Sequence, residues 1–120
     1  MEVKMTADNF WKNEFGNKIV ATDFDGKEIR RKDFGTHSPY DWDVDHILPK
    51  SKNGQNEIVN FQIVNRLTND QKGEKTTFTI NNVTYQVKKT RNANIDELAA
   101  YDYSQKKYCI VTLDGRNAEN

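Results

Sequence analysis

One polar segment constrains this chain more than any other, because it places an acid, a base and two amides at fixed intervals. Asp45 is followed directly by His46. Asn60 lies 14 positions after the histidine, and Asn69 lies nine positions further on. A carboxylate, an imidazole and a carboxamide oxygen are the groups that a general base and a single hard metal ion require to hydrolyse a phosphodiester. The pattern therefore predicts a catalytic site within residues 41–75.

The acid and the base lie at the end of a predicted strand. Trp42 to Asp45 alternate apolar and polar residues, which predicts a strand with Trp42 and Val44 facing the core. Neighbouring side chains on a regular strand point to opposite faces, so the strand must end or bend for Asp45 and His46 to reach one phosphate. Pro49 and the polar loop after it supply that ending.

A second strand and a helix complete the segment. Residues 61–64 are predicted to form a second short strand, and Asn65 is a suitable helix cap for a helix over 66–72 that stops at Gly73. The predicted order is strand, loop, strand, helix. A helix that packs across both strands would bring Asn69 near the acid at the end of the first strand.

The rest of the chain predicts short elements of both kinds, so the fold class is α+β. The expected elements are a helix over 7–15, a hairpin over 19–29 with its turn at Asp25-Gly26, a hairpin over 76–90 with its turn at Asn81-Asn82, a helical turn over 95–100 and a strand over 108–113.

Length and composition exclude several classes of protein. A chain of 120 residues fits one compact domain, 1–120, and 35% hydrophobic residues suffice for a core. Cys109 is the only cysteine, so neither an internal disulfide nor a cysteine-based structural zinc site is expected. No apolar run approaches the roughly 18–20 residues of a membrane span, and the first residues lack a signal-peptide core, so we expect a cytoplasmic protein without a membrane partner.

The charge distribution favours a nucleic-acid partner despite a formal net charge of zero. Residues 46–91 hold eight Lys and Arg residues against three Asp and Glu residues, whereas residues 1–45 hold seven against ten. The basic excess thus coincides with the candidate site. The alternative is that the charges are scattered at random.

The motifs Asp-His-Ile-x-Pro, Asn-Phe-Gln and Asn-x-x-Lys-Gly, in this order within residues 41–75, resemble the HNH endonuclease motif. The wider stretch from Phe10 to about Val87 is similar to small bacterial stand-alone HNH proteins. The resemblance implies a ββα-metal core, here with additional β-hairpins and a short N-terminal helix. Asn53-Gly54 stands where the family usually has paired glycines.

The resemblance also implies roles for the polar residues. His46 would be the general base, and Asp45 and Asn69 would hold one divalent cation. Asn60 would hydrogen-bond the loop that carries His46. Oxygen ligands of this kind suit Mg²⁺, with Mn²⁺ as a substitute. The products would be a 5′ phosphate and a 3′ hydroxyl.

Several basic side chains lie where a phosphate backbone would pass. Contacts of this type position a nucleic acid without reading its sequence, and no recognition helix or arm is evident. The residues expected to make them are Arg66, Lys72 and Lys75 in or beside the predicted helix, with Lys50 and Lys52 in the loop as second choices. Exposure to solvent alone is the alternative for each.

We therefore expect a metal-dependent endonuclease that nicks or cleaves DNA, duplex or single-stranded, with low sequence specificity. One alternative is a nucleic-acid-binding or partner-docking module that has lost catalysis. Another is a toxin or effector nuclease, and since the chemistry tolerates either sugar, its substrate could be RNA.

Overall fold

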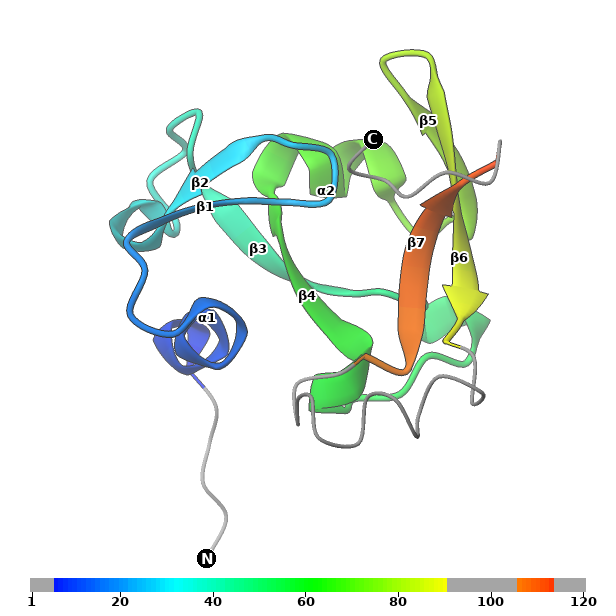
Figure 1. The fold of residues 1–120 in the computed structure, drawn as a ribbon, viewed down its shortest axis with the longest axis horizontal. Helices are drawn as coiled ribbons and strands as arrows, with labels where there is room; N and C mark the ends of the chain where they lie inside the picture. The colour runs from blue at the N-terminus through cyan, green and yellow to red at the C-terminus, as the bar shows by residue number, and fades with distance from the viewer. Residues whose placement is uncertain (1–5, 91–105, 114–120) are drawn as a thin grey trace, which may run out of the picture.

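The computed structural model describes residues 6–90 and 106–113, and this part of the chain is of the α+β class (Figure 1). Three small antiparallel sheets hold the strands in the pairs β1–β2 and β3–β4 and the triplet β5–β6–β7. The elements are α1 (Ala7–Phe15), β1 (Val20–Thr22), β2 (Glu28–Arg30), β3 (Trp42–His46), β4 (Phe61–Asn65), α2 (Arg66–Lys72), β5 (Thr77–Ile80), β6 (Val83–Lys89) and β7 (Tyr108–Thr112), with short 3-10 turns η1 (Arg31–Asp33), η2 (Lys50–Lys52) and η3 (Ile58–Asn60).

Most elements match the sequence prediction, and the helix ends show why. The Thr6 hydroxyl accepts a hydrogen bond from the Asn9 N–H and so caps α1, which ends at Gly16 with φ of 65°. Likewise, the Asn65 side chain caps α2, which ends at Gly73. The predicted helical turn at 95–100 lies outside the described residues.

The main core packs on one face of the β3–β4 pair. Trp11 from α1, Ile29 from β2, and Trp42 and Ile63 from β3 and β4 are buried together, and Val44 packs against them. The rings of Trp11 and Trp42 are 5.1 Å apart between centroids. Because Trp42 and Val44 occupy this face, the alternate residues of β3 point to the opposite face, where α2 packs.

The two predicted hairpin turns have different outcomes. Asn81 and Asn82 both have positive φ, 48° and 68°, and form the predicted two-residue turn between β5 and β6. The turn between β1 and β2 is longer than predicted. Its closing pair is Asp23 and Lys27, joined by a 3.0 Å backbone hydrogen bond, which leaves a three-residue loop with Gly26 at positive φ.

The carboxylate of Asp23 explains that longer loop. Its Oδ1 accepts hydrogen bonds from the backbone N–H groups of Asp25 and Lys27, at 3.0 and 2.9 Å. Its Oδ2 accepts a 2.9 Å bond from the N–H of Asn65, where β4 meets α2. One buried side chain therefore shapes the β1–β2 loop and fastens it to the start of α2.

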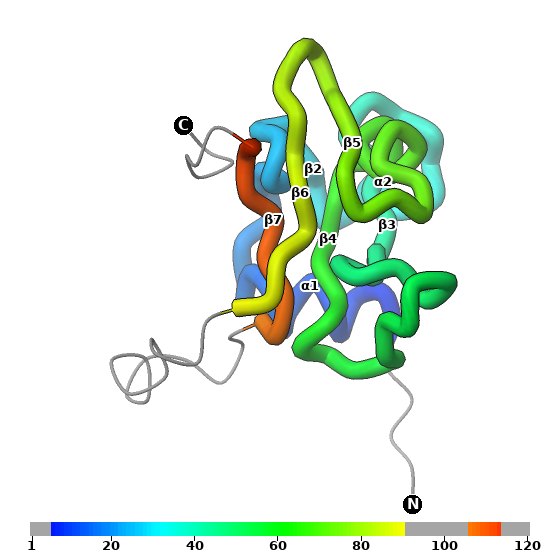
Figure 2. The backbone as a smooth tube through the Cα atoms, turned by 90° about the vertical axis from the view of Figure 1, so that its right-hand side faces the viewer, coloured from blue at the N-terminus to red at the C-terminus, as the bar shows by residue number. Residues whose placement is uncertain are grey.

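The β5–β6–β7 sheet has its own smaller core. Phe78, Ile80 and Tyr85 are buried, and Phe24 from the β1–β2 loop packs against them. The Tyr85 hydroxyl donates to the Asp25 carboxylate at 2.5 Å. Figure 1 shows this sheet to the right of β3 and β4, and Figure 2 shows β6 beside β7 in front of the other sheets. The loop between β1 and β2 thus links the two cores.

Within the described residues, neither helix has the length and apolar character needed to cross a membrane.

We predict that Asp23→Ala lowers the free energy of unfolding by about 2–4 kcal/mol, because the change leaves three N–H groups in this partly buried region without their acceptor. Urea unfolding followed by tryptophan fluorescence measures the loss. Asp70→Ala, at an exposed position of α2, is the control and should change stability by less than about 0.5 kcal/mol. Equal stability of the two variants would contradict the prediction.

Candidate active site

The antiparallel pair β3–β4 carries the predicted acid and base. The register runs without interruption from Trp42 opposite Asn65 to His46 opposite Phe61. Strand β3 is therefore one residue longer than predicted, and the bend expected before the histidine is absent. As a consequence Asp45 and His46 follow the normal alternation and point to opposite faces of the strand.

On the face of β3 that meets α2, four side chains form two parallel contacts. The Asn69 amide Nδ2 donates to Asp43 Oδ2 at 3.0 Å. The Lys72 ammonium lies 3.1 Å from Asp45 Oδ2. Residues two apart on a strand share a face, and residues three apart on a helix are neighbours, so the two contacts fix α2 alongside β3.

Lys72 is completely buried, which contradicts the prediction that it contacts a phosphate. Its Nζ also donates to the main-chain carbonyl of His46 at 2.9 Å. The lysine therefore holds both residues at the end of β3 from the α2 side. A lysine is seldom fully buried unless it is paired, and here the Asp45 carboxylate is its partner.

Asp45 is 9% exposed, and its carboxylate is held through one oxygen. Oδ2 receives the Lys72 ammonium and a 2.9 Å hydrogen bond from the Gln62 amide. Burial raises the pKa of the Asp45 carboxyl above its ordinary value, and Lys72 and Gln62 act against that rise. Within the described residues, Oδ1 of Asp45 accepts no hydrogen bond.

The donor set fits a hard divalent cation by ligand type. Asp45 offers its second carboxylate oxygen, and Asn69 offers its Oδ1 because its Nδ2 is directed at Asp43. Asn69 is hydrogen-bonded to Asp43 and not to Asp45, so the two predicted ligands are diagonal neighbours across the β3–α2 contact. The described part of the chain holds no group of three or more His, Cys, Asp and Glu side chains suited to a metal.

The imidazole of His46 lies on the other side of the strand. Its ring meets the Phe61 ring edge-on, with 4.8 Å between centroids, and its Nε2 is 2.7 Å from Oδ1 of Asn56. Among the described residues, the ring makes no hydrogen bond with Asp45 or Asn69. Sequence reasoning missed Asn56, because an asparagine in a polar loop carries no periodic signal.

Asn60 fixes the loop that follows the histidine. Its side chain is fully buried and pairs with both backbone groups of Leu48: Oδ1 accepts from the N–H at 2.9 Å, and Nδ2 donates to the carbonyl at 3.1 Å. Nδ2 also donates to the Gln55 carbonyl at 3.0 Å. The two ends of the loop are thereby joined by one side chain.

Gly54 sets how closely that loop can fold. Its N–H donates to the Pro49 carbonyl at 2.9 Å, and a Cβ atom at this position would overlap the carbonyl of Leu48. Asn53, just before it, adopts a left-handed conformation with φ of 72°. The loop is thus closed by a backbone contact that only glycine allows.

Four of the predicted nucleic-acid contacts remain on the surface. Lys50, Lys52 and Lys75 are exposed and form no ion pair within the described residues. The Arg66 guanidinium lies 3.7 Å from the buried Asp41 carboxylate, and its side chain is 43% exposed. The three lysines have no ionic partner within the described residues, whereas Arg66 is paired with Asp41.

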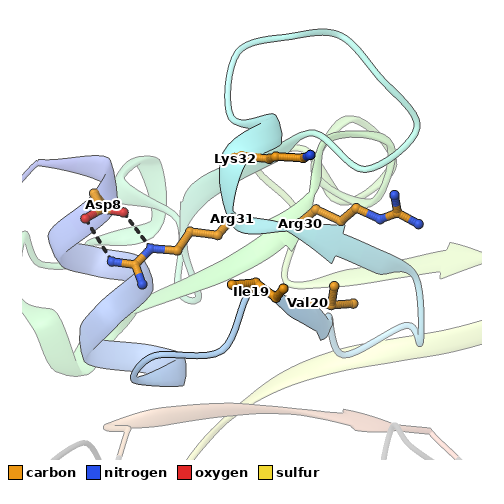
Figure 3. Close-up of a pocket in the computed structure, with 6 residues that line it drawn as sticks. All are labelled: Asp8, Ile19, Val20, Arg30, Arg31 and Lys32. Carbon is orange, nitrogen blue, oxygen red and sulfur yellow. Dashed lines mark hydrogen bonds and ion pairs between the residues drawn. The ribbon is translucent and has the colours of Figure 1, made fainter.

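The basic run Arg30-Arg31-Lys32 lines a separate surface pocket of about 500 Å³ with Ile19 and Val20. Figure 3 shows Arg31 turned toward Asp8 of α1, to which it donates two hydrogen bonds of 2.7 and 2.9 Å. Arg30 donates to Glu28 and stacks over the Tyr40 ring. Two of the three cations are thus engaged within the protein.

Comparison with known proteins gives a match to a protein family. The model of the HNH endonuclease family matches residues 24–78, which include β2, β3, β4 and α2. Searches of the curated proteins and of the solved structures found no match.

We predict that Lys72→Met lowers the free energy of unfolding by about 3–5 kcal/mol, since it leaves the buried Asp45 carboxylate without its counter-ion. Adding Asp45→Asn to this variant should recover part of the loss, because the unpaired charge is then absent. Urea unfolding of the two single variants and the double variant measures the coupling. Lys89→Met, at an exposed position of β6, is the control, and a Lys72 variant as stable as this control would contradict the prediction.

Proposed function

We propose that the protein is a metal-dependent endonuclease that hydrolyses phosphodiester bonds in DNA, because the model of the HNH endonuclease family matches residues 24–78. The observation that carries the proposal is the end of β3, where an acid held by α2 and a histidine on the opposite face are consecutive residues. The family match supports nuclease chemistry in general. The arrangement of the side chains supports separate roles for Asp45 and His46.

In this proposal β3, β4 and α2 form the ββα-metal core of one nuclease domain. The order of the three elements supports this assignment, because an antiparallel pair is followed directly by a helix that packs on one face of the pair. The core of Trp11, Ile29, Trp42 and Ile63 on the opposite face braces the pair from behind. The hairpins on either side would then be additions to that core.

Asp45 and Asn69 would hold a single Mg²⁺ ion, or Mn²⁺ in its place, through the oxygen that each leaves without a hydrogen bond. Such an ion would neutralise charge that develops on the phosphate and on the leaving 3′ oxygen. Lys72 already balances the charge of Asp45, so the protein alone would attract the ion weakly. Phosphate oxygens of the nucleic acid would supply the additional ligands.

His46 would accept the proton of the attacking water. The water oxygen would then form a bond to phosphorus as the bond to the 3′ oxygen breaks. The leaving oxygen would take up a proton from solvent, which gives a 5′ phosphate and a 3′ hydroxyl. Asn60 contributes by fixing the loop after the histidine through Leu48. Because the acid and the base lie on opposite faces, the phosphate would lie across the end of β3.

Lys50, Lys52, Lys75 and Arg66 would contact the phosphate backbone, which favours low sequence specificity. Lys72 is withdrawn from this set because it is buried. We place the activity in the cytoplasm, the compartment expected from the sequence.

We predict that the protein nicks supercoiled plasmid DNA in the presence of Mg²⁺. His46→Ala should slow this reaction about 10²–10⁴-fold, the usual contribution of a general base. His37→Asn is the control. His37 is exposed and has a left-handed backbone conformation, which asparagine also tolerates, so this variant should cut at the normal rate. Conversion of supercoiled to open-circular DNA is followed on gels. A plasmid that stays supercoiled, or a His46 variant as active as wild type, would refute the proposal. Cleavage of single-stranded RNA but not of DNA would identify RNA as the substrate.

A further prediction concerns the metal. EDTA should abolish cleavage, and Mg²⁺ or Mn²⁺ should restore it. Asp45→Asn and Asn69→Ala should each raise the Mg²⁺ concentration for half-maximal rate by about tenfold or more, because each removes one proposed ligand. Asp70→Asn is the matched control on α2 and should leave that concentration unchanged. Cleavage that persists in EDTA would be incompatible with the assignment.

A further inference from the structure

The hydrogen bond between His46 and Asn56 favours one of the two tautomers of the imidazole. Nε2 of the histidine is 2.7 Å from Oδ1 of the asparagine. An amide oxygen can only accept a hydrogen bond, so the nitrogen that faces it must be N–H. A neutral imidazole has one such proton, and the other nitrogen, Nδ1, then carries the free lone pair.

The position of Asn56 is fixed by the buried part of the same loop. The carbonyl of its neighbour Gln55 accepts a 3.0 Å hydrogen bond from the side chain of Asn60. The same amide of Asn60 is bonded to Leu48, two residues after the histidine. One buried asparagine therefore sets the distance between the backbone of Asn56 and the strand that carries His46.

Phe61 limits the orientation of the ring further. It lies directly opposite His46 in the β3–β4 register, and the two rings are inclined by 68°. The hydrogen bond to Asn56 and the edge-on contact with Phe61 together restrain both the rotation and the proton of the imidazole. Neither residue supplies charge, so they act on orientation alone.

We propose that Asn56 is a positioning residue that holds His46 with its proton on Nε2 and directs Nδ1 as the atom that takes the proton from water. This inference rests on the proposed function, in which His46 is the general base. It adds a residue that sequence reasoning did not assign, and it names the reacting atom. The role of Asn56 is exerted through the histidine and not by contact with the substrate.

The contact itself is tested by NMR, without any nuclease assay. In wild-type protein at neutral pH, the ring nitrogen shifts of His46 should give the signal of a proton on Nε2, the nitrogen that faces Asn56. Asn56→Leu, which keeps the size of the side chain but removes the acceptor, should abolish this signal. Asn56→Asp, which keeps an acceptor oxygen, should retain it. A proton found on Nδ1 in wild type would overturn the inference.

The consequence for catalysis is tested by kinetics. Asn56→Leu should lower kcat about 10- to 100-fold with little change in KM, because a misdirected base affects the reacting step and not substrate binding. Asn56→Asp should stay within a few-fold of wild type. In the His46→Ala background, Asn56→Leu should cause no further loss, since the residue acts through the imidazole.

A substitution on a separate element serves as the control. Asn13→Leu, at an exposed position of α1, should leave both kcat and the NMR signal of His46 unchanged. Full activity of Asn56→Leu, or an equal further loss in the His46→Ala background, would overturn the inference while leaving the nuclease assignment intact. If wild type shows the Nε2–H signal but cuts no nucleic acid, the proposed function fails and the contact stands.

Discussion

The buried ion pair between Lys72 and Asp45 determines how α2 lies on the β3–β4 pair. A lysine ammonium without access to water requires a counter-ion and further acceptors, and here the Asp45 carboxylate and the His46 carbonyl provide them. Both acceptors lie at the end of β3, so the last turn of α2 can take only one position along the strand. That position brings Asn69, three residues earlier on the helix, opposite Asp43.

The same ion pair determines the electrostatics of the proposed metal site. Asp45 is already balanced by Lys72, so the only uncompensated charge among the four side chains of the β3–α2 contact is that of Asp43, whose Oδ2 holds the Asn69 amide. With one net negative charge, these four side chains attract a divalent cation only weakly in water. The phosphates of a bound nucleic acid add the missing charge, which would couple metal binding to substrate binding.

Local signals in the sequence were sufficient for most elements but not for the side chains that complete the site. Asn65 and Gly73 bound α2, and Asn81-Asn82 makes the β5–β6 turn, because each effect is confined to a few neighbouring residues. The β1–β2 turn was predicted wrongly because the Asp23 carboxylate accepts from two N–H groups of the loop and is itself held by the N–H of Asn65, 42 positions later.

The burial of Lys72 and the contact between His46 and Asn56 also depend on residues that are distant in the sequence. Lysine is almost always exposed, so nothing short of the β3–α2 packing would have indicated that Lys72 turns inward. Asn56 reaches His46 across ten positions of an irregular loop whose closure depends on Gly54 and Asn60. Family resemblance supplied the acid, the base and the amides, and only the tertiary structure supplies what holds them.

Under the proposed mechanism, the alternation of Asp45 and His46, which separates the acid from the base, suits the reaction better than a bend would. In an in-line displacement at phosphorus, the attacking water and the leaving oxygen lie on opposite sides of the phosphorus atom. A base that serves the water and a carboxylate that serves the leaving-group side must therefore approach from opposite directions. Consecutive residues on a regular strand provide that separation without any strained backbone. Under the proposed mechanism, the straight end of β3 is the feature that lets two adjacent residues act on two sides of one phosphate.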